Sequence, residues 1–182
     1  MANVTRVRPG FRIRTMQVED LPQVATIEHD CFGPEAWPAQ AFRDLVRVFA
    51  ESRPSRGAAW VAEDPADREI LGYTGVEVSA LSGEMDIINI AVAAPHRRRG
   101  IGRGFIEKII QHCRHLGVPL LWLRVRASNV SAQQFYRRLG FERRGRFASY
   151  YLDPDEPAMI MAMDVGDTDS DTERDGDSAV PS

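Results

Sequence analysis

Hydrophobic and polar residues alternate at some places along the chain and recur three or four apart at others, and these changes of period predict its elements. The alternating run at 11–15 predicts a first strand. Helical spacing of apolar residues predicts a helix that begins near 20–22, with a proline in its first turn, and ends at Gly33-Pro34. A second helix is expected over 39–49. Three strands joined by turns then follow, over 58–63, 69–79 and 85–93.

The second half of the chain continues with longer elements. A helix with buried positions at 105, 106, 109, 110 and 113 is expected to end at Gly117. A strand over 120–126 precedes a helix that Asn129 or Ser131 caps and Gly140 ends. Two further strands, 146–151 and 158–165, are expected to form a hairpin. The predicted order is therefore strand, two helices, three strands, helix, strand, helix and two strands.

A glycine-rich turn, Arg-Arg-Arg-Gly-Ile-Gly-Arg-Gly at 97–104, separates the strand at 85–92 from the next helix. Backbone N–H groups in such a turn converge at a helix N-terminus, which favours a phosphate or pyrophosphate. The dinucleotide fingerprint fails because Phe105 stands where its third glycine belongs. The mononucleotide loop fails because the one lysine of the chain, Lys108, lies inside the helix. The turn therefore predicts a different phosphorylated ligand.

The pattern Arg97-x-x-Gly100-x-Gly102 resembles the acetyl-CoA pyrophosphate loop of the GCN5-related N-acetyltransferase (GNAT) superfamily. Residues 123–141 are similar to the second signature of that family, a strand, an Asn-containing turn and a helix ending in Tyr-x-x-x-Gly-Phe. The resemblance runs from about 11 to 165. Within the superfamily the chain looks closest to the ribosomal-protein-alanine N-acetyltransferases (RimI-like). That closer match is carried by Ile27-Glu28, Cys31-Phe32, Trp37, Asn89–Val92, Arg126–Asn129, Tyr150-Tyr151 and Ala158–Met161.

The resemblance implies an α/β fold of the mixed α+β kind, with helices on both faces of a mixed, mostly antiparallel sheet that is splayed in the middle. Acetyl-CoA would lie in the gap. The implied activity is transfer of acetyl to the N-terminal α-amine of a protein, by direct attack of the amine on the thioester. Acetylation of lysine or of a small amine is the alternative, and a non-catalytic CoA-binding protein is a third possibility.

The family also implies which residues hold acetyl-CoA. A strand edge would pair with the pantetheine arm, the glycine-rich turn would hold the pyrophosphate, and an asparagine would touch the pantetheine from the other side. These residues are Ile90, Ala91, Val92, Arg98, Arg99, Gly100, Ile101, Gly102, Arg103, Gly104, Asn129 and Tyr136.

Tyr136 occupies the position of the family's general acid. The alternative is that Tyr136 serves only the core and packs with Phe135. The general base is open, because Arg124 stands where RimI-like enzymes have a glutamate, and an arginine is not a base at neutral pH. Glu35 or Glu77 is a candidate base, or water removes the proton. In a third explanation the substrate differs and Arg124 binds its acidic group.

Four aromatic residues are candidates for contact with the acceptor. Phe32 and Trp37 lie in the loop after the first helix, and Tyr150 and Tyr151 match tyrosines that line the peptide entrance of RimI-like enzymes. For Phe32, packing in the core explains the sequence equally well. For Tyr150 and Tyr151, the alternative is that they are surface aromatics at the end of a strand, without a role in binding.

Length and charge divide the 182 residues into one folded domain and two ends. We expect a flexible N-terminus at 1–10, the acetyltransferase domain at 11–165 and a disordered acidic tail at 166–182. From Asp164 onward there are seven acidic residues and one arginine. Subtracting this charge of −6 from the total of −3 leaves +3 for the rest of the chain, which suits a polyanionic ligand such as CoA and does not demand nucleic acid.

The remaining composition bears on location and partners. Residues 1–10 contain no apolar stretch long enough for a signal peptide, and no later run approaches the length of a membrane span, so neither is expected. Cys31 and Cys113 are expected to be reduced core residues. His112 and His115 lie three apart without further ligands, so no metal is expected. We therefore expect a cytoplasmic protein, a monomer or weak dimer, whose partners are acetyl-CoA and a peptide N-terminus rather than a specific nucleic acid or a membrane.

Overall fold

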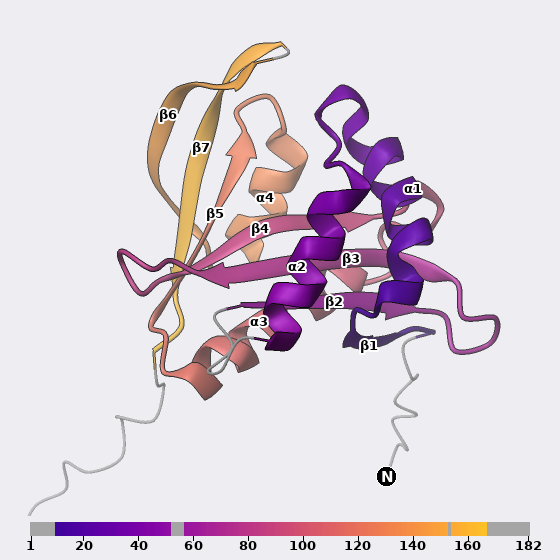
Figure 1. Cartoon of the computed structure of the whole chain (residues 1–182). Helices are drawn as coiled ribbons and strands as arrows, with labels where there is room; N and C mark the ends of the chain where they lie inside the picture. Colours follow the sequence, from indigo (N-terminus) through magenta and orange to yellow (C-terminus); the bar gives the residue numbers. More distant parts are fainter. Residues whose placement is uncertain (1–9, 52–56, 153, 167–182) are drawn as a thin grey trace, which may run out of the picture.

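Seven strands form one sheet in the order β1-β2-β3-β4-β5-β7-β6 (Figure 1). The structure is a computed structural model that describes residues 10–51, 57–152 and 154–166. Its strands are β1 Arg12–Thr15, β2 Gly57–Glu63, β3 Ile70–Val78, β4 Met85–Val92, β5 Leu120–Arg126, β6 Glu142–Leu152 and β7 Asp155–Asp164. Its α-helices are α1 Leu21–Phe32, α2 Ala39–Glu51, α3 Ile101–Leu116 and α4 Val130–Arg138. Short 3₁₀ turns lie at Val18–Asp20, Gly33–Glu35 and Ala94–His96.

The sheet is mixed and mostly antiparallel, as predicted. Every neighbouring pair is antiparallel except β4 and β5, which run parallel. A parallel pair needs a crossover, and α3 supplies it between these two strands.

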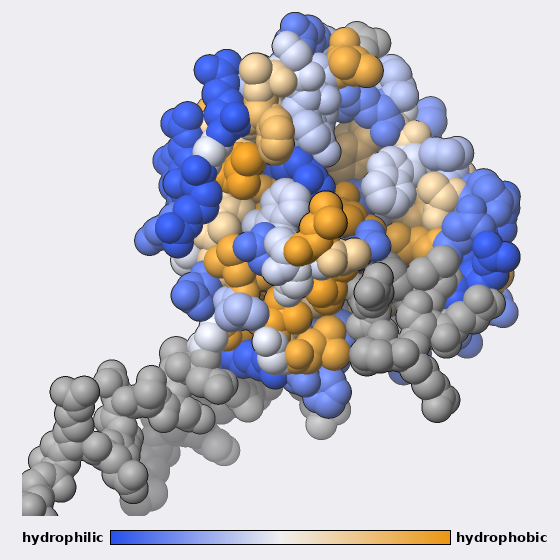
Figure 2. All heavy atoms as spheres, turned by 60° about the vertical axis from the view of Figure 1, so that its left-hand side comes forward, coloured by the Kyte–Doolittle hydropathy of each residue, from blue (hydrophilic) through white to orange (hydrophobic). Residues whose placement is uncertain are grey.

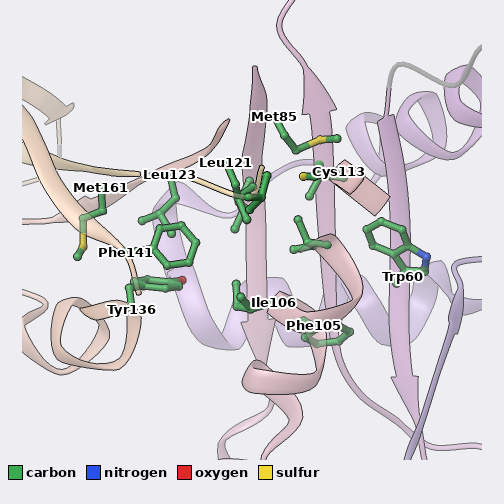
Figure 3. Packing of buried hydrophobic residues seen from close by; sticks show 14 of the residues in the cluster. Trp60, Met85, Phe105, Ile106, Cys113, Leu121, Leu123, Tyr136, Phe141 and Met161 are labelled. Atoms are coloured by element: carbon green, nitrogen blue, oxygen red, sulfur yellow. The ribbon is translucent and has the colours of Figure 1, made fainter. Parts of the chain in front are cut away.

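Helices cover both faces of the sheet, which confirms the predicted layers. α1 and α2 lie on one face and α3 lies on the other (Figure 1). Side chains of β2 alternate between two cores, since Val61 packs with the residues of α1 while Trp60 packs with those of α3. The larger core centres on the apolar stripe of α3 and extends to Tyr136 and Phe141 (Figure 3).

The order of elements matches the prediction, and most bounds agree within a residue or two. The hairpin differs, because β6 begins at Glu142 and β7 at Asp155. β6 is the edge strand, and all eleven of its residues are exposed or half-buried. Its pairing with β7 also contains two register shifts. Its sequence therefore lacks the clean alternation that marks a half-buried strand.

The predicted ends of the chain fall almost wholly outside the described residues, since these begin at 10 and stop at 166. Cys113 is buried as expected, whereas Cys31 is only half-buried. Both cysteines are free thiols. No helix of the described ranges is long and apolar enough to cross a membrane.

Candidate active site

The centre of the sheet opens because β4 and β5 pair over three residues and then part. Met85–Ile87 pair with Leu121–Leu123. Beyond that point β4 continues beside β3 to Val92, and β5 continues beside β7 to Arg126. A cleft of about 1130 Å³ lies between the two strands and under α1 and α2. Figure 2, which brings the side of β6 and β7 forward, shows a hollow near the top of that face.

The parting leaves one edge of β4 without a strand partner. Ile90 lines the cleft, as expected for a residue whose backbone would pair with an extended ligand. Ala91 is buried among the residues of α1 and contributes only its backbone. The carbonyl oxygen of Val92 already accepts from Nε of Arg97 at 3.0 Å. Ile90, Ala91 and Val92 therefore lie at this edge, and the carbonyl oxygen of Val92 already accepts a hydrogen bond.

The N-terminus of α3 has no side-chain cap. Gly100 precedes it with a φ of +87°, a backbone conformation that favours glycine. The first helical bond runs from the N–H of Gly104 to the carbonyl of Gly100, 3.0 Å long. The N–H groups of residues 101–103 thus have no acceptor one turn earlier. This end of the helix can hold a polyanion, which fits the pyrophosphate of CoA.

Close packing explains the other two glycines of the loop. A Cβ on Gly102 would lie 3.2 Å from the ring of Phe135 in α4, and one on Gly104 would lie 3.0 Å from Ile13. Both are tighter than ordinary contacts, so larger residues would push α3 away from its neighbours. The glycines fix where the helix end lies relative to the cleft.

Arginines surround this helix end. Arg98 has a φ of +66°, and Arg99 contacts Nδ1 of His96 at 2.9 Å. Arg99 and Arg103 also line a shallow depression of about 430 Å³ beside the first turn of α3. Two of the three expected basic side chains, Arg99 and Arg103, therefore lie beside the first turn of α3.

On the opposite wall, Asn129 and Tyr136 both line the cleft. Asn129 is the N-cap of α4, and its side-chain oxygen accepts from the N–H of Ala132 at 3.1 Å. Its amide NH₂ group is the part available to a ligand. The sequence allowed either Asn129 or Ser131 as the cap of this helix, and the structure shows Asn129.

Tyr136 belongs to the larger core and also lines the cleft. It is 7% exposed and packs edge-on against Phe135 and Phe141. Figure 3 shows its ring beside that of Phe141. Burial raises the pKa of its phenol, so the hydroxyl is protonated at neutral pH. A protonated hydroxyl on the wall of the cleft is able to donate a hydrogen bond to a bound ligand.

Arg124 lines the cleft but is not free. It donates to Oδ2 of Asp86 on β4 at 2.5 Å, and its guanidinium lies 4.4 Å from the Trp122 ring and 5.4 Å from the Tyr150 ring. Burial raises the pKa of Asp86 to about 6 even though Arg124 opposes that change. The second oxygen of Asp86 is buried without a partner among the described residues. The family's glutamate is thus replaced by an arginine that a neighbouring carboxylate holds.

The two candidate bases differ in their surroundings. Glu35, in the 3₁₀ turn after α1, forms an ion pair with Arg126 of β5, which also binds Glu156 at 2.9 Å and stacks 4.1 Å from Tyr151. This contact joins the two walls of the cleft. Glu77 lies on the cleft at β3, directly opposite Asp86, and its side chain is exposed.

The expected acceptor-contacting aromatics all line the cleft. Phe32 is 36% exposed and Tyr150 is 43% exposed, while Trp37 packs 5.8 Å from Phe42. Phe32 therefore faces the opening rather than the core. Trp37 lines the cleft and also packs against the core of α1. Their position agrees with a role at the entrance.

Glu28 is a cleft residue that the sequence reasoning did not select. It is 1% exposed and accepts hydrogen bonds from the Tyr73 hydroxyl, from Nδ2 of Asn89 at 3.2 Å and from the N–H of Trp37 at 2.8 Å. Burial raises the pKa of Glu28. It ties α1 to the central strands and fixes the loop that carries Glu35. Its position four residues after Val24, inside the apolar stripe of α1, is a signal that marks a buried carboxylate.

No group of three or more histidine, cysteine, aspartate or glutamate side chains in the described ranges is arranged to hold a metal ion.

Comparison with known proteins places these features in a family. A model of the acetyltransferase (GNAT) family matches residues 21–141. The [ribosomal protein bS18]-alanine N-acetyltransferase of Escherichia coli (strain K12) is 31% identical over 155 residues, which cover 84% of this chain and 97% of that protein. Streptothricin acetyltransferase of Streptomyces lavendulae is 35% identical over 132 residues, covering 65% of this chain and 70% of that protein.

Solved structures agree with the fold. The crystal structure of the ribosomal-protein-S18-alanine N-acetyltransferase from Escherichia coli matches with a TM-score of 0.72 at 26% identity, covering 90% of this chain and 99% of that one. Ard1 from Thermoplasma volcanium matches with a TM-score of 0.74 at 23% identity, covering 87% and 99%, and shares the fold alone.

Proposed function

We propose that this chain, which belongs to the acetyltransferase (GNAT) family and is an acyltransferase, transfers acetyl from acetyl-CoA to the N-terminal α-amine of a protein. The observation that carries the proposal is the parting of β4 from β5 beside the uncapped end of α3. The choice of an α-amine is supported by the RimI-like relatives, one of which is 31% identical over nearly its whole length.

The pantetheine arm and the pyrophosphate of acetyl-CoA each have a matching feature in this chain. The backbone edge at Ile90 suits the amide groups of the pantetheine arm, and the N–H groups of residues 101–103 suit the pyrophosphate. Asn129 offers its amide NH₂ from the opposite wall. Arg98, Arg99 and Arg103 add positive charge around the phosphates.

Tyr136 acts as the general acid in this proposal. Its protonated hydroxyl donates to the sulfur as the bond between sulfur and the acetyl carbon breaks, while the acceptor nitrogen forms the new bond to that carbon. The amine then loses a proton and the sulfur finally carries one. The buried position of the ring against Phe141 fixes the direction of the hydroxyl.

The amine needs little help to lose its first proton. An α-amine with a pKa near 8 is neutral in about a tenth of molecules at pH 7, whereas a lysine near 10.4 is neutral in about one of 2,500. We therefore assign that proton to water. Glu35 and Glu77 then act as negative charges that attract the ammonium form of the acceptor.

A small-molecule amine is the second candidate acceptor, because streptothricin acetyltransferase is 35% identical over 132 residues. Phe32 and Tyr150 both line the cleft of about 1130 Å³, whose volume does not discriminate between the two kinds of acceptor. The acceptor is therefore decided by experiment.

The test compares CoA release from acetyl-CoA with one alanine-initiated peptide that contains an internal lysine, offered with a free or a blocked α-amine. We expect release only with the free peptide. Equal release with both forms shows lysine acetylation. Release with neither peptide, but with a small amine offered in its place, overturns the protein-acceptor proposal. A parallel run with Tyr136→Phe reports whether the observed release comes from this site.

A further inference from the structure

Five arginines form a surface where α4 meets the edge strand β6. We call it the arginine surface, and it consists of Arg137, Arg138, Arg143, Arg144 and Arg146. All five are exposed, and none lines the cleft. Arg144 contacts Glu142 at 3.4 Å, while the other four have no ion pair within the described ranges.

Strand register places members of this surface on one face of the sheet. Arg143 stands opposite Met161 and Arg146 opposite Met159, and both methionines belong to the core that Tyr136 of α4 also joins. Paired residues on neighbouring strands point to the same face. Arg143 and Arg146 therefore lie on the α4 side of the sheet, the side on which α4 ends with Arg137 and Arg138. Figure 2 shows hydrophilic residues gathered along one flank of the face that it brings forward.

The acidic end of the chain departs from the neighbouring strand. β7 is paired with β6, and Ala162 stands opposite Glu142, the first residue of β6. The chain leaves the described ranges after Gly166, four residues beyond Ala162. The segment 167–182 then carries six acidic residues and one arginine, a net charge of −5 against the five positive charges of the surface.

Length permits contact between the two. Sixteen residues extend at most about 55 Å, and the first arginine of β6 lies only a few residues of strand away from the point of departure. A tethered segment has an effective concentration in the millimolar range, so even weak exposed ion pairs add up to measurable occupancy.

We propose that segment 167–182 binds the arginine surface and shields it from other polyanions such as RNA. The proposal concerns a surface apart from the cleft and does not depend on which amine is acetylated. Its alternative is that the arginine surface stays open and binds nucleic acid in the full-length protein.

The test uses the full chain and a tail-neutral variant in which the six acidic residues of 167–182 become Asn or Gln. We expect the amide NMR signals of 137–147 to differ between the two chains at 50 mM salt and to coincide at 1 M salt, where charges are screened within about 3 Å. No difference in these signals at low salt overturns the proposal.

A second readout is binding of a fluorescent 20-nucleotide poly(U) probe. We expect the tail-neutral variant to bind about tenfold more tightly than the unaltered chain, which corresponds to about 1.4 kcal/mol. Adding Arg143→Gln with Arg146→Gln should remove this gain. The matched control, Arg43→Gln with Arg47→Gln on α2, lowers the net charge equally and should keep it.

These controls separate contact from overall charge, since neutralising the tail changes the net charge from −3 to +3. Equal loss of binding in the surface pair and the α2 pair would mean that net charge alone is at work, and the proposal would be wrong. Equal probe affinity of the unaltered and tail-neutral chains would mean that the surface is open to nucleic acid, which also overturns it.

Discussion

Replacing Asp86 by asparagine should stabilise this protein at neutral pH and have much less effect in acid. Asp86 is 8% exposed on β4, holds Arg124 through one oxygen and leaves the other without a partner in the described residues. Asparagine has the same shape, and its side-chain oxygen can still accept from Arg124. The substitution therefore removes a buried charge without removing the contact.

The magnitude follows from the pKa of Asp86. Burial raises it from 3.8 to about 6, and each unit corresponds to about 1.36 kcal/mol, so the ionised group costs about 3 kcal/mol in the fold. Between about pH 4 and 6 the folded protein keeps a proton that the unfolded chain has lost. This contribution to the free energy of unfolding therefore falls as pH rises, and the cost is fully present above about pH 6.

Urea unfolding at constant ionic strength, followed by tryptophan fluorescence, measures the effect. We expect Asp86→Asn to exceed the unaltered protein by about 3 kcal/mol at pH 7.5 and by about 1 kcal/mol at pH 4.5. Asp30→Asn, whose side chain is 71% exposed, is the matched control. A variant that is less stable at pH 7.5, or a difference that does not change with pH, would refute the reasoning and show that the pair with Arg124 outweighs burial.

Three further changes test other parts of the account. Tyr136→Phe should lower kcat about 100-fold or more with little change in the KM for acetyl-CoA, while Tyr150→Phe should leave kcat nearly unchanged; steady-state kinetics would contradict the assignment if both lost activity equally. Gly72→Ala places a Cβ 2.6 Å from a carbonyl oxygen of β4 and should cost about 1–3 kcal/mol in urea unfolding, whereas Gly145→Ala, 3.4 Å from its neighbour, should cost clearly less. Glu35→Gln should raise the KM for peptide several-fold and change kcat less than about threefold; a 100-fold loss of kcat with a shifted acid limb would instead identify Glu35 as the base.

Local signals in the sequence predicted most of the fold. The glycine at 117 ends α3 in the left-handed conformation, as its position after the last apolar residue indicates, and Asn129 caps α4. Periodicity does not report on strand edges, so β6 was placed four residues late. Its exposed, arginine-rich start has no alternating pattern to reveal it.

Contacts across the cleft were beyond the reach of sequence reasoning. The Glu35–Arg126 and Asp86–Arg124 pairs join residues 91 and 38 positions apart, and no periodic pattern links them. Glu28 was within reach, since its spacing from Val24 and Leu21 places it on the buried face of α1. A carboxylate in such a stripe must find donors, and here it finds three.

The measurement that bears most directly on the central claim locates the acetyl group itself. An alanine-initiated peptide with one internal lysine is incubated with acetyl-CoA and the full chain. Tandem mass spectrometry of the product then assigns the added acetyl group to one nitrogen. The account predicts acetyl on the α-amine and none above background on the lysine. Acetyl on the lysine, or an unmodified peptide beside an acetylated small amine, would contradict it.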